Sequence, residues 1–255
     1  MSNCYEFDKY VSNYDFNDLN IKLKYYHSYR VMKLGEKYSQ LIGFNDDEIK
    51  LATTIGLIHD IGRFEQFKRY NTFFDKKSVD HADLGCEILF ENNLIKNFWS
   101  NEKDYDTIYF SIKNHNKLDI PKTDDELMIK QAKLIRDIDK LDILYLRGYL
   151  KEVKFRTSND KISPKVLDSI IEHKSVNISD INNTNDSISC NFAFAFDINN
   201  DELIDELKRN ITYFYNSVNH DNIFDEIYSE IINYLNERKD KYVKHKVQSL
   251  RSWKK

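Results

Sequence analysis

The stretch LIHDIGRFEQFKRY, residues 57–70, places His59 and Asp60 side by side at the end of an apolar run. Arg63, Lys68 and Arg69 follow within the same stretch. A helix that packs in the core can carry such a pair for two reasons. The pair is either a polar C-terminus or part of a metal site with phosphate-binding cations beside it. The other histidines and carboxylates of the chain decide between these two interpretations.

The composition is that of a globular, helix-rich chain. Of the 255 residues, 41% are hydrophobic and 31% are charged, and the formal net charge of -4 does not suggest a surface for duplex nucleic acid. The count of 6 glycines and 2 prolines favours long helices over sheet folds, which need many tight turns. The sequence contains no glycine-rich phosphate loop.

Features that would direct the chain to a membrane or an oxidising compartment are missing from the sequence. No apolar run approaches the roughly 20 residues of a membrane span. The N-terminus has no basic region followed by an apolar one, so it is not a secretory signal. The 3 cysteines are widely spaced and form no disulfide framework or zinc pattern. We therefore expect a cytoplasmic protein.

Apolar periodicity predicts an all-α chain with three parts. These are an N-terminal extension (1–20), a core (21–150) and a C-terminal helical part packed on that core (151–255). In the core we predict helices over 21–42, from 45 to about 62, from 78 or 80, over 105–115 and over 125–150. The first of these carries an apolar stripe that ends at Leu41. Asn45 with Glu48 resembles a capping box, and a polar loop of roughly fifteen residues is expected after Gly62.

The C-terminal part has weaker patterns. Residues 156–185 are polar and are predicted as loop, or as loop plus a short helix near 166–172. The segment CNFAFAFDINN, residues 190–200, alternates Phe and Ala as a strand would, but Ala favours helix and its neighbours are helical. We therefore predict a buried helix there. Further amphipathic helices are predicted over 203–219 and 223–236, and the basic tail from 238 is predicted to be a solvated helix end.

Four histidines lie on the apolar stripes of successive predicted helices: His27, His59, His81 and His115. A single buried histidine is more often a hydrogen-bonded core residue than a metal ligand. Four of them change this balance, because each imidazole needs a partner once it is buried. A shared metal ion satisfies all four together, so the pattern predicts a metal site.

The segment LIRDIDKLDIL, residues 134–144, supplies carboxylates. Asp139 falls in the middle of the apolar stripe of its predicted helix, so it must be paired or metal-bound. Asp142 lies near the edge of the stripe and is a candidate to support a ligand. Asp137 falls on the opposite face, where we expect it to be solvated.

Taken in chain order, His27, His59–Asp60, His81, His115 and Asp139 resemble the ligand set of the HD superfamily of metal-dependent phosphohydrolases. The segments that match the family's local pattern are HSYRVMKLG (27–35), GLIHDIGRF (56–64) and IRDIDKLDIL (135–144). The resemblance covers about residues 21 to 150. It implies an all-helical HD-domain bundle with additional C-terminal helices. The interval RFEQFKRYNTFFDKKSVDHADLG (63–85) is similar to a bacterial subgroup of these proteins.

The resemblance also implies two divalent metal ions. One ion would be held by His27, His59, Asp60 and Asp139. The second would be held by His81 and His115, with Asp60 bridging both. Mixed imidazole and carboxylate ligands suit manganese, iron, cobalt, nickel or zinc better than calcium. Two such ions can bind one bridging water and lower its pKa from 15.7 toward about 7, which gives hydroxide at neutral pH.

Arg63 stands where many two-metal members of the family carry lysine, because this chain has HDIGR in place of HDxGK. The arginine keeps a cation and adds a bidentate fork that suits phosphate. We therefore assign Asp60 and Arg63 to catalysis, and Arg63 and Arg69 to substrate binding. Weaker candidates are Arg30, Lys76 and Lys77, and we expect Lys140 to be a solvated neighbour or a salt-bridge partner.

These features predict a phosphohydrolase or phosphodiesterase that acts on a nucleotide-like phosphoester through a metal-bridging hydroxide. Its partner would be a small phosphate-bearing molecule. Two alternatives stay open. Within the superfamily the same six ligands also serve di-iron oxygenases of small polyols or phosphonates, so the ligands alone do not separate the two reactions. A non-catalytic nucleotide sensor is the second alternative, and the complete ligand set argues against it.

Overall fold

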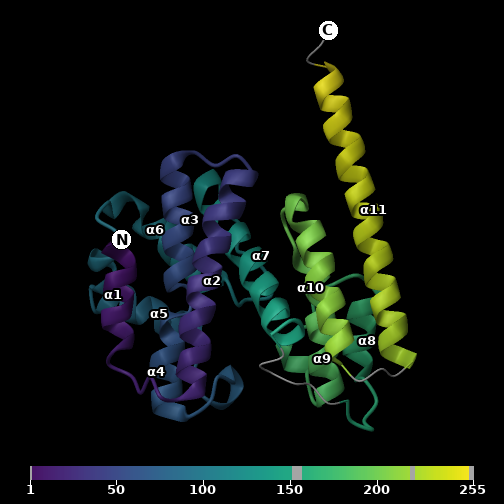
Figure 1. The fold of residues 1–255 in the computed structure, drawn as a ribbon, viewed down its shortest axis with the longest axis horizontal. Coiled ribbons are helices and arrows are strands. Elements are labelled where there is room, and N and C mark those ends of the chain that lie inside the picture. The colour runs from purple at the N-terminus through teal and green to yellow at the C-terminus, as the bar shows by residue number, and fades with distance from the viewer. Residues whose placement is uncertain (1, 151–156, 219–221, 253–255) are drawn as a thin grey trace. The chain divides into compact units, whose positions relative to one another are not determined.

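The chain is all-α, as predicted. The computed structural model describes residues 2–150, 157–218 and 222–252, and every regular element in these ranges is helical (Figure 1). None of the helices described is long and apolar enough to cross a membrane. The chain divides into two compact units, 1–139 and 140–255, and the division falls within helix α7 (Glu126–Gly148). The predicted boundary at 150/151 adjoins residues 151–156, which lie outside the described ranges.

Unit 1 contains six helices and the first part of α7. The six are α1 (Ser2–Val11), α2 (Leu19–Leu41), α3 (Asp46–Ile58), α4 (Ile61–Tyr70), α5 (His81–Cys86) and α6 (Tyr105–Asn114). Figure 1 shows α2 and α3 side by side, joined by a short turn in which Gly43 has a φ of 86°. The predicted capping box is present, since the Asn45 side chain accepts from the Glu48 backbone and the Glu48 side chain from that of Asn45.

The loop predicted after Gly62 was wrong, because its first part is helix α4. Ile61 and Phe64 are fully buried and lie three residues apart, so this segment has a helical apolar stripe of its own. Asn71 ends α4 with a φ of 51°. Between α3 and α4 the backbone of Asp60 departs from helical geometry, with φ -101° and ψ 17°. The His-Asp pair therefore stands at the break between two helices.

Two further details of unit 1 concern the N-terminal extension, for which no structure was predicted, and Leu41, for which burial was predicted. The N-terminal extension contains α1, whose Phe7 is fully buried and contacts the rings of Tyr25 and Phe64. Leu41, expected on the buried stripe of α2, is 58% exposed because it is the last residue of that helix and lies beyond the core.

Two glycines of GLIHDIG decide how closely neighbouring helices approach the site. A Cβ atom on Gly56 would lie 2.9 Å from the Val31 carbonyl oxygen of α2. A Cβ atom on Gly62 would overlap the carbonyl oxygen of His81 at the start of α5. The missing side chains therefore allow α3 to pack on α2, and α4 on α5, at the distances observed.

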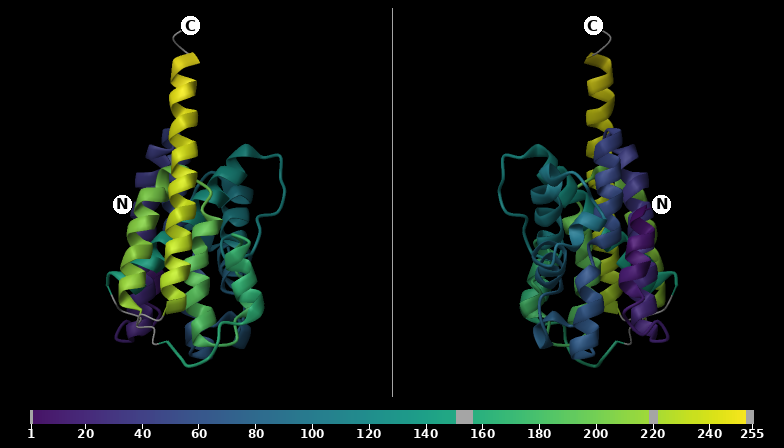
Figure 2. Two further views of the ribbon diagram at one scale, coloured as in Figure 1. Left: turned by 90° about the vertical axis from the view of Figure 1, so that its right-hand side faces the viewer. Right: turned by 90° about the vertical axis from the view of Figure 1, so that its left-hand side faces the viewer.

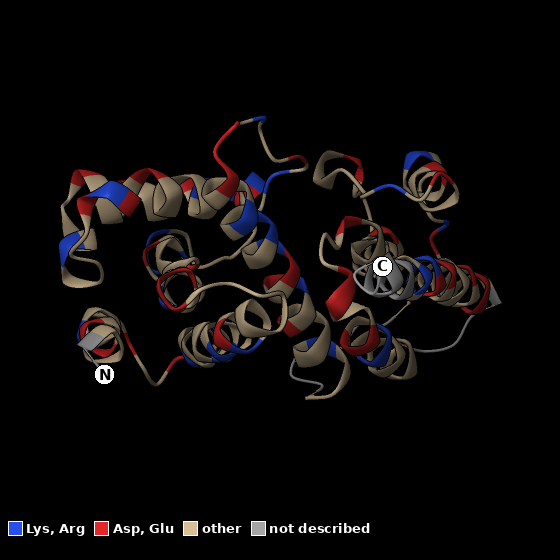
Figure 3. Ribbon diagram, turned by 90° about the horizontal axis from the view of Figure 1, so that it is seen from above, with Lys and Arg blue, Asp and Glu red and all other residues tan. Residues whose placement is uncertain are grey.

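Unit 2 contains the remainder of α7 and four further helices: α8 (Pro164–Ile171), α9 (Thr184–Ala193), α10 (Ile204–Ser217) and α11 (Asn222–Ser252). The buried helix predicted within 190–200 is confirmed, because α9 continues into a 3-10 turn over Phe194–Asp197. Helix α11 continues into the basic tail, as predicted for a helix end, and its C-terminal end projects past α10 in both side views (Figure 2). Basic and acidic positions are interspersed along the helices of each unit (Figure 3).

Candidate metal centre

The six predicted ligands come together within unit 1 from separate helices. They are His27 in α2, His59 and Asp60 between α3 and α4, His81 at the start of α5, His115 directly after α6, and Asp139 in α7. The four histidines are between 0% and 3% exposed, and Asp60 is 2% exposed. Five of the six candidate ligands are therefore almost fully withdrawn from water.

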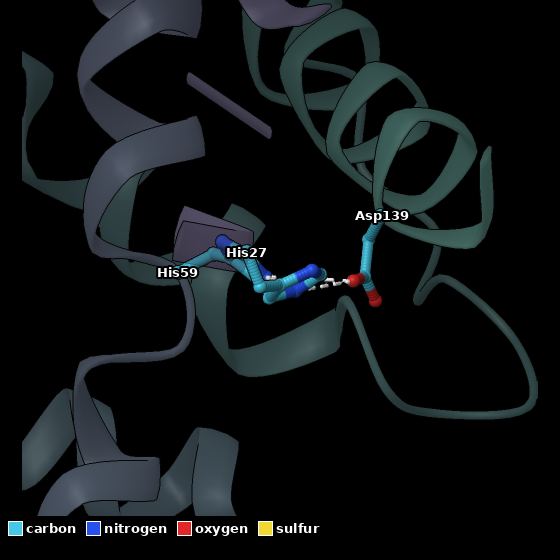
Figure 4. Close-up of side chains that lie close together, drawn as sticks. All are labelled: His27, His59 and Asp139. Carbon is cyan, nitrogen blue, oxygen red and sulfur yellow. Dashed lines mark hydrogen bonds and ion pairs between the residues drawn. The ribbon is translucent and has the colours of Figure 1, made fainter. Parts of the chain in front are cut away.

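One group consists of His27, His59 and Asp139 (Figure 4). His27 Nε2 lies 3.3 Å from His59 Nε2 and 3.1 Å from Asp139 Oδ1, and His59 Nε2 lies 3.5 Å from that oxygen. Asp139 Oδ1 is buried and accepts no hydrogen bond of normal geometry. Ligand atoms about 2.0–2.2 Å from one metal ion lie roughly 3–3.5 Å from one another, so these spacings fit a shared ion.

Asp60 joins this group to a second one. Its Oδ2 lies 3.4 Å from His27 Nε2 and 3.7 Å from His59 Nε2. Its Oδ1 lies 3.4 Å from His81 Nε2 and 3.6 Å from His115 Nε2, and these two nitrogens are 3.0 Å apart. The carboxylate thus turns one oxygen toward each pair of imidazoles, which is the arrangement that a bridging ligand requires.

Hydrogen bonds behind the rings decide which nitrogen faces the site. The Nδ1 atoms of His59 and His115 lie 2.9 Å and 2.6 Å from a backbone carbonyl oxygen three residues earlier in the chain. A carbonyl oxygen only accepts, so each Nδ1 carries a proton and each ring turns its Nε2 toward the site. His81 Nδ1 is 2.7 Å from Asp75 Oδ2, so the Nε2 of His81 also faces the site. The Nε2 atoms of His81 and His115 lie 3.0 Å apart, a spacing that suits two ligands of one cation.

Both ligand carboxylates are ionised despite their burial. Burial alone would raise the pKa of Asp60, but the Lys24 ammonium and the His59 imidazole outweigh it and hold that pKa well below its usual range. Burial also opposes ionisation of Asp139, whose pKa is nevertheless held well below its usual range by the imidazoles of His27 and His59. Carboxylates beside imidazoles are a donor set for transition metals such as manganese, iron, cobalt, nickel or zinc.

Sequence reasoning missed two residues of this site. Lys24 Nζ donates to Asp60 Oδ2 at 2.6 Å. Its spacing of three residues from His27 puts both on one helix face, and this signal could have identified it. Asp75, which accepts the hydrogen bond from His81, begins the short 3-10 turn Asp75–Lys77 and carries no periodic signal.

Arg63 lies beside the bridging carboxylate and is also bound to the protein. Its Nε is 3.7 Å from Asp60 Oδ1. Its Nη1 donates to Asp75 Oδ1 at 2.7 Å and to the Phe73 carbonyl oxygen at 2.6 Å. The guanidinium is thus fixed next to the site, with its position set by the loop that follows α4.

The other predicted cations contact residues outside the six candidate ligands or are exposed. Arg69 donates to Glu65 at 2.7 Å, and its side chain is 46% exposed. Lys76 and Lys77 are exposed on a short 3-10 turn. Lys140 forms an ion pair of 2.8 Å within unit 2, which is one of the two roles expected for it.

The expectation that Asp137 faces water was wrong. Asp137 is 0% exposed and Asp142 is 2% exposed, and both have interaction partners. The stripe argument assumed that one face of α7 is solvated, but residues 134–138 are buried without interruption, so the helix is covered on every side there. Asp139 is nevertheless the aspartate that lies beside His27 and His59.

Comparison with known families agrees with this geometry. Residues 25–144 match the family model of the HD domain, and all six ligand positions fall inside that span. The match identifies residues 25–144 as an HD domain, a kind of domain found in metal-dependent hydrolases. No curated protein and no solved structure gives a significant match. HD domains bind divalent metals, and the histidine and aspartate groups described above are the residues that could hold them.

Proposed function

We propose that this protein is a phosphohydrolase or phosphodiesterase that acts on a nucleotide-like phosphoester with two divalent transition metals. The observation that carries the proposal is the Asp60 carboxylate, which turns Oδ2 toward His27 and His59 and Oδ1 toward His81 and His115. A site for one ion needs only one of these imidazole pairs. Two pairs around one shared carboxylate support two ions.

In this proposal, different residues of the chain bind the metal ions and the phosphate of the substrate. When bound, the two ions supply a water of lowered pKa, toward about 7, and positive charge for the phosphoryl oxygens. Asp60, Asp139 and the four imidazoles would hold the ions. The Arg63 guanidinium, fixed beside Asp60, binds a phosphate oxygen of the substrate. Arg69 is a weaker proposal, because its guanidinium is already paired with Glu65.

Two cations beside the bridging carboxylate support a substrate that carries phosphate. Lys24 lies 2.6 Å from Asp60 Oδ2, and Arg63 Nε lies 3.7 Å from Asp60 Oδ1. A polyol would gain little from these charges, whereas a phosphate dianion gains charge-assisted hydrogen bonds. We also propose that the enzyme works on small molecules in the cytoplasm.

The test combines metal analysis with a substrate panel. The purified protein is assayed for phosphate release from nucleoside mono-, di- and triphosphates and from phosphodiesters, with manganese, iron, cobalt, nickel or zinc added in turn. We expect metal-dependent turnover of at least one phosphoester. Asp47→Asn is the matched control, because the Asp47 side chain is 90% exposed and pairs with Lys50 away from the site.

Two results would replace this proposal by another function. Oxygen consumption with iron and a polyol or phosphonate, without phosphoester turnover, would identify an oxygenase. Saturable nucleotide binding at full metal occupancy, with no turnover of any phosphoester, would identify a sensor.

A further inference from the structure

Asp75 holds one imidazole of the metal centre from behind. Its Oδ2 lies 2.7 Å from His81 Nδ1, and its Oδ1 accepts from Arg63 Nη1 at 2.7 Å and from Gln66 Nε2 at 2.8 Å. The Asp75 side chain is 26% exposed, whereas the His81 side chain is 3% exposed. A partly solvated carboxylate therefore reaches inward to a buried ring.

A buried amide fixes the position of this carboxylate. Gln66 in α4 is 0% exposed, and its Nε2 lies within hydrogen-bond distance of Asp75 Oδ1, Ser78 Oγ and the Val79 carbonyl oxygen at 2.8–2.9 Å. Its Oε1 accepts from Arg63 Nη1 at 2.8 Å. Gln66 thus binds the loop between α4 and α5 at several points and holds Asp75 opposite His81.

The contact to His81 differs from those of two other imidazoles in the site. His59 and His115 donate from Nδ1 to a backbone carbonyl oxygen, which follows from the helix that carries each ring. His81 donates to a charged side chain from a separate loop. A carboxylate partner fixes the ring orientation and makes the opposite nitrogen a stronger electron-pair donor to a metal.

Neighbouring Asp80 does not take this role, although its carboxylate is close to Asp75 and His81. Asp80 Oδ1 accepts from the backbone N–H groups of Ala82 and Asp83 at the start of α5. Its Oδ2 is 2.5 Å from Lys117 Nζ. Asp80 is therefore engaged as the helix cap, and Asp75 is the carboxylate that contacts the His81 ring nitrogen.

We propose that Asp75 is a positioning residue for the second metal subsite: it fixes His81 with Nδ1 protonated and Nε2 turned toward His115 and Asp60, and Gln66 and Arg63 hold it there. This inference extends the proposed two-metal function, on which it rests. It gives Arg63 a second task besides phosphate binding. It also assigns the loop after α4 to metal affinity at one subsite, that of His81 and His115.

The variant Asp75→Asn tests the proposal, because it keeps the shape of the side chain and removes its charge. We expect the variant to bind the first metal equivalent as the parent chain does. The second equivalent should bind about 10- to 100-fold more weakly, the usual effect of losing such an outer partner. Metal affinity is measured by cobalt titration followed through its visible absorption and by elemental analysis after dialysis.

Asp80→Asn is the matched control, since it removes a carboxylate from the same loop and keeps a good helix cap. It should leave both equivalents unchanged. Equal affinities for both equivalents in Asp75→Asn and in the parent chain would overturn the proposal. So would equal losses in the two variants, because they would show a general effect of charge in this loop.

A measurement on the parent chain keeps the proposal testable if Asp75→Asn does not fold. The ring nitrogens of His81 are assigned by long-range 1H–15N correlation in metal-free protein at mildly alkaline pH. We expect a protonated Nδ1 and an unprotonated Nε2, and the reverse tautomer would overturn the proposal. If the parent chain bound no second metal, the two-metal function would fail, while this measurement would still decide whether Asp75 fixes the tautomer of His81.

Discussion

Asp60 is the residue that lies between the two imidazole pairs of the candidate metal centre. Its two oxygens face different imidazole pairs, and each oxygen also has a cation near it, Lys24 Nζ at 2.6 Å from Oδ2 and Arg63 Nε at 3.7 Å from Oδ1. An aspartate at the break between α3 and α4 can extend toward both pairs because its backbone is not part of either regular helix. A bridging ligand at this position needs both the negative charge and the two equivalent oxygens of a carboxylate.

We predict that Asp60→Asn loses more metal and more turnover than His81→Ala or His115→Ala. The amide keeps one oxygen acceptor but removes the charge and the second oxygen, so it weakens both subsites. Each histidine variant removes a ligand of one subsite. Elemental analysis and phosphoester turnover measure the difference. Equal metal loss in all three variants would instead indicate a single ion.

Arg63→Ala should reduce kcat/KM by about ten- to a hundred-fold, because charge-assisted hydrogen bonds contribute roughly 1.5–3 kcal/mol. Arg63→Lys should recover part of this loss, since lysine keeps the charge and lacks the fork. We expect most of the metal to remain in Arg63→Ala, because Gln66 still holds Asp75. Steady-state kinetics and metal analysis are measured on the same samples.

A lower melting temperature with normal turnover would assign a different role to Arg63. Its ion pair with Asp75 would then be structural, and the assignment of a phosphate-bearing substrate would lose support.

Among individual residues, the sequence could predict those that interrupt an apolar stripe with a polar side chain. A histidine or aspartate in the middle of an apolar stripe is visible without a structure, and the six predicted ligands meet in the fold. Lys24 lies three residues before His27 on the same helix face, a signal that was not used, whereas Asp75 begins a short 3-10 turn and has no periodic pattern around it. The burial of Asp137 depends on what surrounds α7, which periodicity does not reveal.

At the scale of elements, Gly62 connects local sequence to the second subsite. It belongs to α4, and an added Cβ would overlap the His81 carbonyl oxygen and the backbone of Gly85 in α5. The atoms that such a Cβ would meet are all backbone atoms of α5, so no side chain can rotate away. Helices α4 and α5 therefore have to move apart to accept a side chain at Gly62.

We predict that Gly62→Ala destabilises the fold by about 1–3 kcal/mol, the usual cost of overpacking. It should also weaken the second metal equivalent, because moving α5 displaces His81. Thermal unfolding and metal titration measure the two effects. Gly43→Ala is a useful comparison, since a Cβ there meets no atom within 4 Å, although its φ of 86° adds backbone strain. Retention of both metals at normal affinity in Gly62→Ala would show that α5 tolerates the shift.

Most helices of unit 1 could be predicted from capping residues and periodicity, as α2, α3, α6 and α7 show. Helix α4 was missed because Gly62 and a run of charged residues resemble a helix end followed by loop. The structure shows that Gly62 serves close packing against α5 and that Ile61 and Phe64 supply the buried face. A glycine required by tertiary contact and one that ends a helix look the same in a sequence.

At the scale of the whole molecule, the six candidate ligands all lie in residues 1–139, which form unit 1. We predict that metal binding stabilises this unit by about 2.7 kcal/mol at a free metal concentration 100-fold above the dissociation constant. Chelation should reverse the effect. Hydrogen exchange measured with and without metal should show increased protection concentrated in α2 to α6. An equal increase across α8 to α11 would contradict a site confined to unit 1.

Four helix ends lie at the candidate site, and their backbone charges oppose one another. Helices α3 and α6 end immediately before His59 and His115, whereas α4 and α5 begin at Ile61 and His81. The C-terminal ends carry partial negative charge and favour a cation, while the N-terminal ends carry partial positive charge and favour an anion, each by about 0.3–1 kcal/mol. Because these contributions offset one another, the side chains have to supply the preference for a cation, and variants that lack one ligand should lose metal affinity step by step.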